Sequence, residues 1–338
     1  MPRNTDKRPL PQHHKRSHHN NYRGRGIYMI TLCTDGRLPL LGNLIGDSPE
    51  TAAIYPSSLG EQVLQCWNNI PLIQQQIAQR KAECTGEPCQ RNISLIACLL
   101  MPDHFHGIIF VREEMDVSIG DVVRGFMVGC TKVYNEQNSI EEKSSIPLKP
   151  LWEKGYHDRI LLYAGQLQNM IAYVRDNPRR LWLKKMKPEY FAVQHNVHWN
   201  DYCFSAVGNI LLLDNPLYAV HVRSRFSEED ARNYMNDCIV AARNGSVLIG
   251  AFISPKEKQI LEVALNECLP IIVLLPHGFS EYYKPVGKFM EACAQGKMLF
   301  LAEASESSPH NGITREKCVR LNAIAEEMME VAIVNDGE

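Results

Sequence analysis

Two histidines in this sequence are spaced as metal ligands on a strand would be. His104 and His106 flank Phe105, directly after the apolar run 93–100. Because successive side chains of a β-strand point to opposite faces, both imidazoles would share one face while Phe105 points to the other. Two imidazoles on a rigid strand suit a divalent cation, whose shell other ligands or water can complete. The alternative is a half-exposed strand whose polar residues simply face outward.

A tyrosine and an asparagine follow on a predicted helix. Apolar residues recur there at helical spacing, at Leu167, Met170, Ile171 and Val174. This pattern predicts a helix over 166–176 that ends before Pro178, since the residue preceding a proline disfavours the helical conformation. Tyr173 and Asn177 are four residues apart and would lie on one face of that helix.

These residue types can perform phosphodiester chemistry together. A tyrosine hydroxyl becomes a useful nucleophile when its proton is removed or its target is polarised. A cation held by His104 and His106 could polarise a phosphodiester, and the amide oxygen of Asn177 is a candidate third ligand. The alternative is that Tyr173 is an ordinary residue of an amphipathic helix and Asn177 is its C-cap.

The order of these segments resembles the single-tyrosine HUH nucleases, and among them the REP-associated tyrosine transposases. The resemblance covers about residues 24–190 and rests on segments 26–34, 101–107, 117–138, 151–160 and 173–178. They are similar, in order, to the family's first strand, its metal-site segment, the helix that follows, the strand before the tyrosine helix, and that helix. The resemblance implies an α+β ferredoxin-like domain, an antiparallel sheet with helices, over residues 26–200.

The resemblance also implies a reaction. His104 and His106 would hold Mg²⁺ or Mn²⁺, with Asn177 at the position of the third ligand. Tyr173 would attack single-stranded or hairpin DNA, leaving a 5′-phosphotyrosine and a free 3′-hydroxyl. A later 3′-hydroxyl could rejoin the strand, which is strand transfer rather than hydrolysis. Asp103 departs from the asparagine expected before the first histidine, and either supports a ligand or caps a turn.

Positive charge is concentrated in the first 200 residues. They hold 24 Lys and Arg against 19 Asp and Glu, whereas residues 201–338 hold 12 against 19. A basic balance suits a domain that handles DNA. Residues 1–25 are rich in Arg, Lys and His and poor in apolar residues, which predicts a flexible arm. Such an arm either grips phosphates, with Arg23 and Arg25 at its end, or is a solvated terminus without a role.

Further basic residues surround the tyrosine segment. Arg179, Arg180, Lys184 and Lys185 follow it, with Trp182 among them. Basic groups interleaved with an aromatic ring suit single-stranded DNA, because phosphates are neutralised while bases stack. His157 and Arg159 precede the helix and are candidates for contact with the scissile strand. Residues of this segment could equally pack a strand.

From about residue 201, short apolar runs alternate with helical patterns. Strands are predicted at 209–213, 219–222, 246–249, 270–275 and 298–302, and helices at 227–244, 255–266, 283–295 and 315–334. This alternation implies a mostly parallel sheet covered by helices, a Rossmann-like α/β domain over 201–338. The sequence has no Gly-x-Gly-x-x-Gly, so dinucleotide binding has no support.

This half resembles, more loosely, the Rossmann-like domain of the DNA-processing protein A family. The residues that carry the resemblance are 224–226, 250–255 and 270–279. Members of that family bind single-stranded DNA. Ser254 and Pro255 begin a predicted helix, whose backbone N–H groups could form an anion site. The alternative is a capped helix without a ligand.

Three functions are compatible with these patterns. The first is a metal-dependent DNA transposase or nicking and rejoining enzyme. The second is a DNA-hairpin-binding regulator descended from one, and the third is a nucleotide- or small-ligand-binding enzyme centred on the C-terminal half. The complete set of His104, His106, Tyr173 and Asn177 favours the first.

The sequence lacks the features of a membrane or exported protein. It has no apolar run long enough to span a bilayer, and its first residues lack the apolar core of a signal peptide. We therefore expect a cytoplasmic protein without membrane contact. A monomer and a homodimer are both compatible with the sequence.

Overall fold

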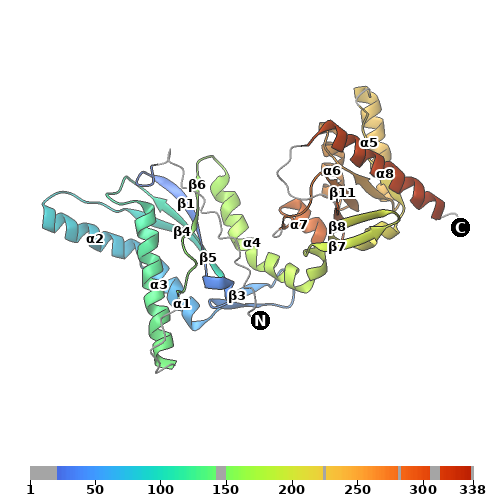
Figure 1. Cartoon of the computed structure of the whole chain (residues 1–338). Coiled ribbons are helices and arrows are strands. Elements are labelled where there is room, and N and C mark those ends of the chain that lie inside the picture. The colour runs from blue at the N-terminus through green and yellow to red at the C-terminus, as the bar shows by residue number, and fades with distance from the viewer. Residues whose placement is uncertain (1–20, 142–149, 224–225, 281–282, 305–312, 336–338) are drawn as a thin grey trace, which may run out of the picture. The chain divides into compact units, whose positions relative to one another are not determined.

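The chain forms two compact units, Met1–Trp182 and Leu183–Glu338 (Figure 1). The computed structural model describes residues 21–141, 150–223, 226–280, 283–304 and 313–335. Residues 1–20 of the predicted arm, and Ser224 and Arg225 of the looser resemblance, lie outside the described residues. None of the helices in the described ranges combines the length and hydrophobicity that crossing a membrane requires.

An antiparallel sheet of four strands forms the centre of the first unit. Its strands are β1 (Gly26–Cys33), β4 (Ile93–Met101), β5 (His104–Val111) and β6 (His157–Leu161), in the order β4-β5-β1-β6. Every neighbouring pair is antiparallel. Pro102 and Asp103 form the turn between β4 and β5, so the hairpin turn directly precedes the first histidine. The strand predicted over 151–160 begins later, and Trp152 forms only an isolated bridge to Thr34.

Helices cover one face of this sheet with the larger core of the unit. They are α1 (Ser58–Asn68), α2 (Ile70–Thr85) and α3 (Ile119–Glu141). Figure 1 shows α1 and α3 on one side of the sheet and α4 (Gln166–Met186) on the other. Phe105 is fully buried on the α1 and α3 side, where it packs against Trp67 and Phe126. The prediction that Phe105 points into the core is therefore confirmed.

The tyrosine-bearing helix α4 packs on the opposite face through a smaller apolar cluster. Val174 is buried there against Met29 of β1 and Ile108 of β5. The partly buried residues around them include Leu167, Met170 and Ile171. The residues that predicted the helix are thus the ones that attach it to the sheet.

The predicted helix end at Pro178 is wrong. α4 continues through Pro178 to Met186. Proline lacks the N–H that would bond to the carbonyl four residues earlier, so the helix loses one internal bond at Val174 and continues. Pro178 is buried, and the residues after it are good helix formers such as Leu181 and Leu183. Burial and propensity outweigh the local cost of the proline. Asn177 consequently lies inside the helix and is not its C-cap.

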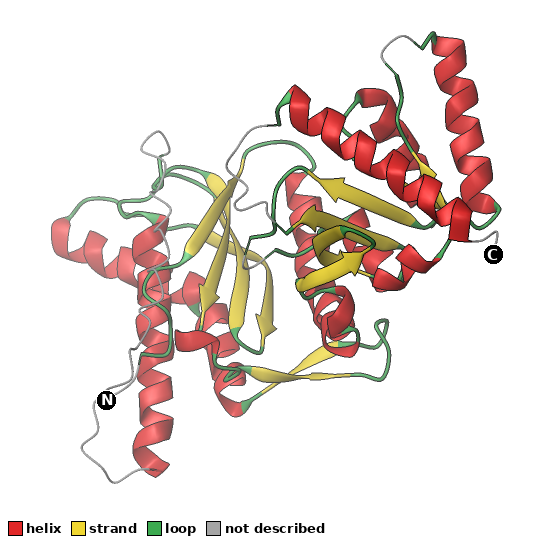
Figure 2. Ribbon diagram, turned by 45° about the vertical axis from the view of Figure 1, so that its right-hand side comes forward, coloured by secondary structure: helices red, strands yellow, loops and turns green. Residues whose placement is uncertain are grey.

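A two-stranded ribbon stands beside the sheet and contacts the same helix. It consists of β2 (Gly42–Ile45) and β3 (Ala53–Pro56), and Figure 2 shows it as a separate pair of strands. Trp182 of α4 donates a hydrogen bond from Nε1 to the carbonyl oxygen of Gly46, at 3.2 Å. Gly46 has φ +111°, a conformation that favours glycine. Trp182 thereby ties the ribbon to the tyrosine helix.

The second unit contains a mixed sheet of six strands. They are β7 (Gln194–Trp199), β8 (Tyr202–Gly208), β9 (Leu217–Ala219), β10 (Val247–Gly250), β11 (Ile271–Leu275) and β12 (Met298–Glu303). The order is β7-β8-β12-β11-β10-β9. β9 to β12 run parallel, whereas β7 and β8 pair antiparallel at one side. The second sheet thus begins at residue 194, before the boundary at 200 that the sequence analysis placed.

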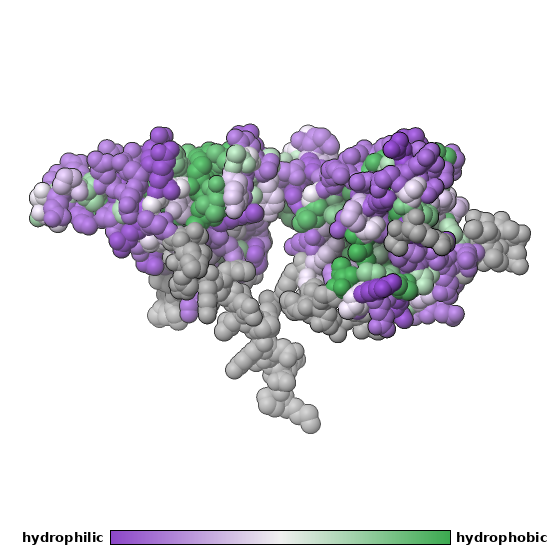
Figure 3. Space-filling model, turned by 90° about the horizontal axis from the view of Figure 1, so that it is seen from above, coloured by the Kyte–Doolittle hydropathy of each residue, from purple (hydrophilic) through white to green (hydrophobic). Residues whose placement is uncertain are grey.

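The helices of the second unit alternate with its parallel strands, as predicted. They are α5 (Glu228–Arg243), α6 (Pro255–Asn266), α7 (Lys288–Ala294) and α8 (Arg315–Asn335). The chain is therefore α+β, with an antiparallel sheet followed by a mixed sheet that has parallel strands. The ferredoxin-like and Rossmann-like assignments stay predictions. On the face seen in Figure 3, hydrophilic residues predominate and hydrophobic residues gather in limited patches.

Three predicted elements of this unit are wrong in type or extent. Residues 210–214 form a 3₁₀ helix instead of a strand, because Asn209 accepts a hydrogen bond from Leu211 N and begins a helical turn. The strand predicted over 219–222 is β9, which ends at Ala219. The helix predicted over 283–295 begins only at Lys288, since Gly287 has φ +57°. Strands β7 and β8 were not predicted.

Gly107 provides a test of the packing that orients β5. A Cβ added there would lie 2.3 Å from the ring of Trp67, which is itself buried. We expect Gly107→Ala to lower the free energy of unfolding by about 1–3 kcal/mol, because the overpacked ring must move. The measurement is urea denaturation of the full chain.

Gly125→Ala is the matched control. Gly125 lies in α3, and an added Cβ there meets no heavy atom within 4 Å. The same substitution in a helix interior should be neutral or stabilise by about 0.5–1 kcal/mol. Equal effects of the two substitutions would contradict the proposed role of Trp67.

Candidate functional site

The two histidines lie side by side on the face of the sheet that α4 covers. In the antiparallel register, Cys33 is opposite His104 and Thr31 is opposite His106. The imidazole ring centroids are 4.7 Å apart, with the rings edge to face. The spacing predicted from the alternation of the strand is therefore present. The hydrogen bonds of each ring determine which of its nitrogens carries a hydrogen and which could bind a cation.

His104 is hydrogen bonded to the residue before it. Its Nδ1 lies 2.6 Å from Oδ1 of Asp103. An ionised carboxylate only accepts hydrogen bonds, so Nδ1 carries the hydrogen. In the neutral imidazole the other nitrogen, Nε2, then has a free lone pair for a metal.

Burial keeps the ring of His106 in its neutral form. It is 5% exposed, and its Nδ1 lies 2.8 Å from the hydroxyl oxygen of Thr31. Burial lowers the pKa of His106 to about 3, with smaller contributions from His104 and Arg37. The ring is therefore neutral at physiological pH. When Thr31 accepts the hydrogen bond from Nδ1, Nε2 is free to coordinate a cation.

Tyr173 lies against the second of these rings. The ring centroids of Tyr173 and His106 are 6.1 Å apart, and the rings are nearly perpendicular. The side chain is 39% exposed, so a substrate can reach it. The guanidinium carbon of Arg180 lies 5.4 Å from the centroid of the tyrosine ring. Histidine, tyrosine and arginine from two separate elements thus meet at one place.

Asn177 lies one helical turn after Tyr173. Among the described residues, its buried Nδ2 has no hydrogen-bond partner. The two ends of a carboxamide have the same shape, so a 180° rotation would put Oδ1, a metal-binding oxygen, at this position. An amide oxygen and imidazole nitrogens are ligand types that suit a hard or borderline divalent cation. In the described part of the chain, no three His, Cys, Asp or Glu side chains are grouped as metal ligands. Two imidazoles and one amide stay the predicted donor set.

The edge strand β6 adds polar side chains to the same face. His157 is opposite Thr31, and Arg159 is opposite Met29, in the register with β1. Directly opposite residues of an antiparallel pair point to the same side of the sheet. His157 and Arg159 therefore share the face of His106, and both are exposed. The predicted contact of these two residues with DNA stays a prediction.

Arg23 and Arg25, which were also predicted to contact DNA, lie away from the histidines. Arg25 lies over the ring of Phe110 at the opposite end of β1, and Arg23 precedes it. The length of β1 separates them from the histidines, roughly 23 Å at about 3.3 Å per residue. Arg179 forms an ion pair with Asp176, at 2.6 Å. Lys184 and Lys185 are in the last turn of α4, within the second unit.

The predicted anion position in the second unit holds one of the chain's own carboxylates. Ser254 caps α6 by accepting a hydrogen bond from Glu257 N, and Pro255 is the first residue of the helix. The carboxylate of Glu257, which is 4% exposed, accepts hydrogen bonds from Ser254 N, Ile253 N and Val222 N. These N–H groups therefore already have a negatively charged acceptor within the chain. These contacts favour the alternative of a capped helix.

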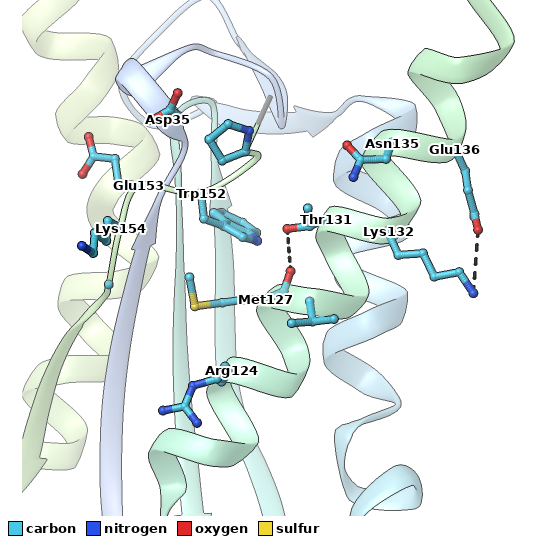
Figure 4. A pocket seen from close by; sticks show the side chains of 13 residues that line it. Asp35, Arg124, Met127, Thr131, Lys132, Asn135, Glu136, Trp152, Glu153 and Lys154 are labelled. Carbon is cyan, nitrogen blue, oxygen red and sulfur yellow. Dashed lines mark hydrogen bonds and ion pairs between the residues drawn. The ribbon is translucent and has the colours of Figure 1, made fainter. Parts of the chain in front are cut away.

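A large groove lies on the opposite face of the first unit. It has a volume of about 1140 Å³ and runs between α3 and the segment 150–155 (Figure 4). Its charged lining residues are Arg124, Lys132 and Lys154 and, opposite in sign, Asp35, Glu136 and Glu153. Balanced charges give no net attraction for phosphate. This groove therefore lacks the positive balance that a phosphate-binding surface would have.

Two residues that support the histidines were assigned no definite role from the sequence. Thr31 belongs to β1, and its position opposite His106 depends on the pairing of strands far apart in the chain. No local signal reveals that pairing. Asp103 adjoins His104, but only the turn geometry shows where its carboxylate points.

Comparison with known proteins finds limited similarity. No family model matches the chain. An uncharacterised protein of Haemophilus influenzae is 25% identical over 189 residues, which cover 49% of this chain and 89% of that protein.

Solved structures show only distant likeness. One is a REP-associated tyrosine transposase bound to a REP hairpin, at 15% identity and TM-score 0.26, covering 48% of this chain and 72% of the other. Another is DNA processing protein A from Helicobacter pylori, whose structure concerns single-stranded DNA binding, at 18% identity and TM-score 0.30, covering 41% and 65%. Similarity at this level carries no argument about function.

The depressed pKa of His106 predicts loss of stability in acid. The unfolded imidazole takes up a proton below about pH 6.5, whereas the folded one does so only near pH 3. The contribution of His106 to stability is therefore fully present above pH 6.5 and is lost as the pH is lowered toward 3. Lowering the pH from 7 to 5 should therefore reduce the free energy of unfolding by about 2 kcal/mol through His106 alone. Urea denaturation in EDTA at both pH values measures it.

Two variants isolate this contribution. His106→Gln should lose less stability than the wild type between pH 7 and pH 5. His157→Gln removes an exposed histidine of the same unit and should leave the decline unchanged. An undiminished decline in His106→Gln would show that other groups cause it.

Proposed function

We propose that the first unit is a metal-dependent nuclease and strand-transfer enzyme for single-stranded or hairpin DNA, with Tyr173 as its nucleophile. The observation that carries this proposal is the 6.1 Å separation of the Tyr173 and His106 rings, on a face where His104 is adjacent. A surface-exposed tyrosine beside two imidazoles that can each present an unprotonated nitrogen is an arrangement suited to phosphoryl transfer.

The chain would hold Mg²⁺ or Mn²⁺ through Nε2 of His104, Nε2 of His106 and the amide oxygen of Asn177. When bound, the cation would withdraw charge from the scissile phosphate and orient it. The burial of His106 keeps its ring neutral at physiological pH, so that one of its two nitrogens is unprotonated, as ligation requires. Water would complete the coordination shell, as is usual for these cations.

The reaction then consists of one exchange of bonds at phosphorus. The phenol oxygen of Tyr173 forms a bond to phosphorus as the bond from phosphorus to the 3′-oxygen breaks. The phenol loses its proton to solvent, and the departing 3′-oxygen gains one. The products are a 5′-phosphotyrosine and a free 3′-hydroxyl, so no water is consumed. Attack by a 3′-hydroxyl in the reverse sense rejoins DNA and restores the tyrosine.

Arg180 is placed to assist this exchange. Its guanidinium lies near the tyrosine ring and is always protonated at physiological pH. Negative charge develops on the phosphate oxygens and the phenol oxygen in the transition state, and a nearby fixed cation stabilises it. His157 and Arg159, on the edge strand of the same face, would contact the strand on either side of the scissile phosphate.

A covalent adduct tests the nucleophile. Full-length protein with Mn²⁺ and labelled single-stranded DNA pools enriched in imperfect hairpins should give a denaturation-resistant adduct. EDTA should prevent it, and Tyr173→Phe should reduce it below detection, because phenylalanine has no attacking oxygen. Denaturing gel electrophoresis measures the adduct, and native gels measure binding.

Tyr163→Phe is the control for this substitution. Tyr163 is 73% exposed in the same unit, directly before α4, and should retain full adduct formation. DNA binding without any adduct in the wild type would instead support a hairpin-binding regulator. An adduct that persists in Tyr173→Phe would refute the assignment of the nucleophile.

The role of Arg180 can be separated from general charge. Arg180→Ala should slow adduct formation by about 10- to 100-fold while changing DNA binding little, since its charge acts mainly in the transition state. Arg175→Ala removes an exposed arginine from the same helix and should leave the rate within about twofold. Single-turnover kinetics with saturating protein distinguish the two, and equal slowing would leave Arg180 no specific role.

A further inference from the structure

We propose that Asp103 is a positioning residue that fixes the ring of His104 in the tautomer and orientation needed for metal binding. This inference rests on the proposed metal site and concerns a residue that differs from the asparagine expected at this position. The carboxylate oxygen Oδ1 lies 2.6 Å from His104 Nδ1, a short distance for such a pair.

The backbone around Asp103 is held by a buried residue of the neighbouring loop. Thr34 is fully buried, and both its N–H and its hydroxyl lie 3.0 Å from the carbonyl oxygen of Asp103. Leu41 N donates to the carbonyl oxygen of Pro102. The turn between β4 and β5 is therefore tied to the segment after β1, and the carboxylate starts from a fixed position.

The second carboxylate oxygen has its own partner. Nη1 of Arg37 lies 3.4 Å from Oδ2 of Asp103, and Nε of Arg37 lies 3.7 Å from Glu153. Both oxygens of Asp103 are thus engaged by side chains, which leaves the carboxylate the role of support and not of a direct ligand. Arg37 has φ +57°, in the left-handed region that is costly for a residue with a Cβ.

Aspartate and asparagine would affect the tautomer of His104 differently. An ionised carboxylate only accepts, so His104 must carry its hydrogen on Nδ1. An amide can either accept or donate and would permit either tautomer. Aspartate therefore selects the tautomer with a free Nε2, and its charge also strengthens the ring as a ligand. His106 has no such selection, because the hydroxyl of Thr31 can donate or accept.

The first test reads the tautomer directly and needs no metal. Full-length protein labelled with ¹⁵N-histidine is studied by long-range ¹H–¹⁵N correlation at pH 8, where free imidazoles are largely neutral. His104→Gln assigns the signal. We expect an unprotonated Nε2 and a protonated Nδ1 in the wild type. Asp103→Ala should shift the population toward protonated Nε2, and Asp103→Asn should retain part of the wild-type preference.

The second test measures metal affinity. Mn²⁺ binding is followed by the loss of the free-ion electron paramagnetic resonance signal, with thermal unfolding to confirm that each variant folds. Asp103→Ala should weaken binding by about 10- to 100-fold, the usual effect of removing a residue that supports a ligand. Asp103→Asn should weaken it less. Asp47→Asn removes an exposed carboxylate of the same unit and should leave affinity unchanged.

The two measurements separate this inference from the proposed function. If the wild type binds no Mn²⁺ yet Asp103→Ala still changes the tautomer of His104, the metal chemistry fails and the positioning role stands. An unchanged tautomer in Asp103→Ala would overturn the inference. So would a loss of Mn²⁺ binding in Asp103→Asn as complete as that in His104→Ala, because Asp103 would then be a ligand itself.

Discussion

The burial of Phe105 is the constraint on which the candidate site depends. Its ring lies 5.0 Å from that of Trp67 and 5.5 Å from that of Phe126, in the core beneath α1 and α3. Because strand residues alternate, this single anchor directs both neighbouring histidines to the other face. A shift of one residue in register would turn the histidines toward α1 and α3 and Phe105 toward α4. The close fit of Gly107 against Trp67 opposes such a shift. The packing on one face of the sheet therefore determines which side chains lie on the other face.

The tyrosine helix is attached to this sheet more lightly than α1 and α3 are. Its buried contact with the sheet is the small cluster of Val174 with Met29 and Ile108, whereas the opposite face carries the larger core. The hydrogen bond from Trp182 to Gly46 adds a second point of attachment nearer the end of the helix. Pro178 removes one helical hydrogen bond between these two attachments. The position of Tyr173 relative to His106 thus depends on few contacts, so the helix should be the less firmly held layer of this unit.

The sequence pattern predicted those features of the candidate site that depend on residues close together in the chain. The alternation around Phe105 placed the histidines, and the helical spacing from Leu167 to Val174 placed Tyr173 and Asn177 on one helix. The predicted stop at Pro178 failed because burial of that residue outweighed its local preference. Thr31 could not be found, since its place opposite His106 arises from the pairing of β1 with β5, about 75 residues apart. In the second unit, the repeating strands and helices from 246 onward were visible. Strands β7 and β8 were not, because β7 is largely polar and their antiparallel pairing interrupts no helical pattern. The roles of the site residues stay predictions.

The two histidines of the candidate site have different surroundings. A metal ligand must present an unprotonated nitrogen at neutral pH. For His106 this follows from desolvation, which lowers its pKa far below the physiological range and needs no charged partner. For His104, which is more exposed, a carboxylate determines which nitrogen carries the hydrogen. Burial therefore holds one imidazole and a hydrogen bond to a carboxylate holds the other. Because only one of the two rings is buried, the face beside them still contains a tyrosine that is 39% exposed.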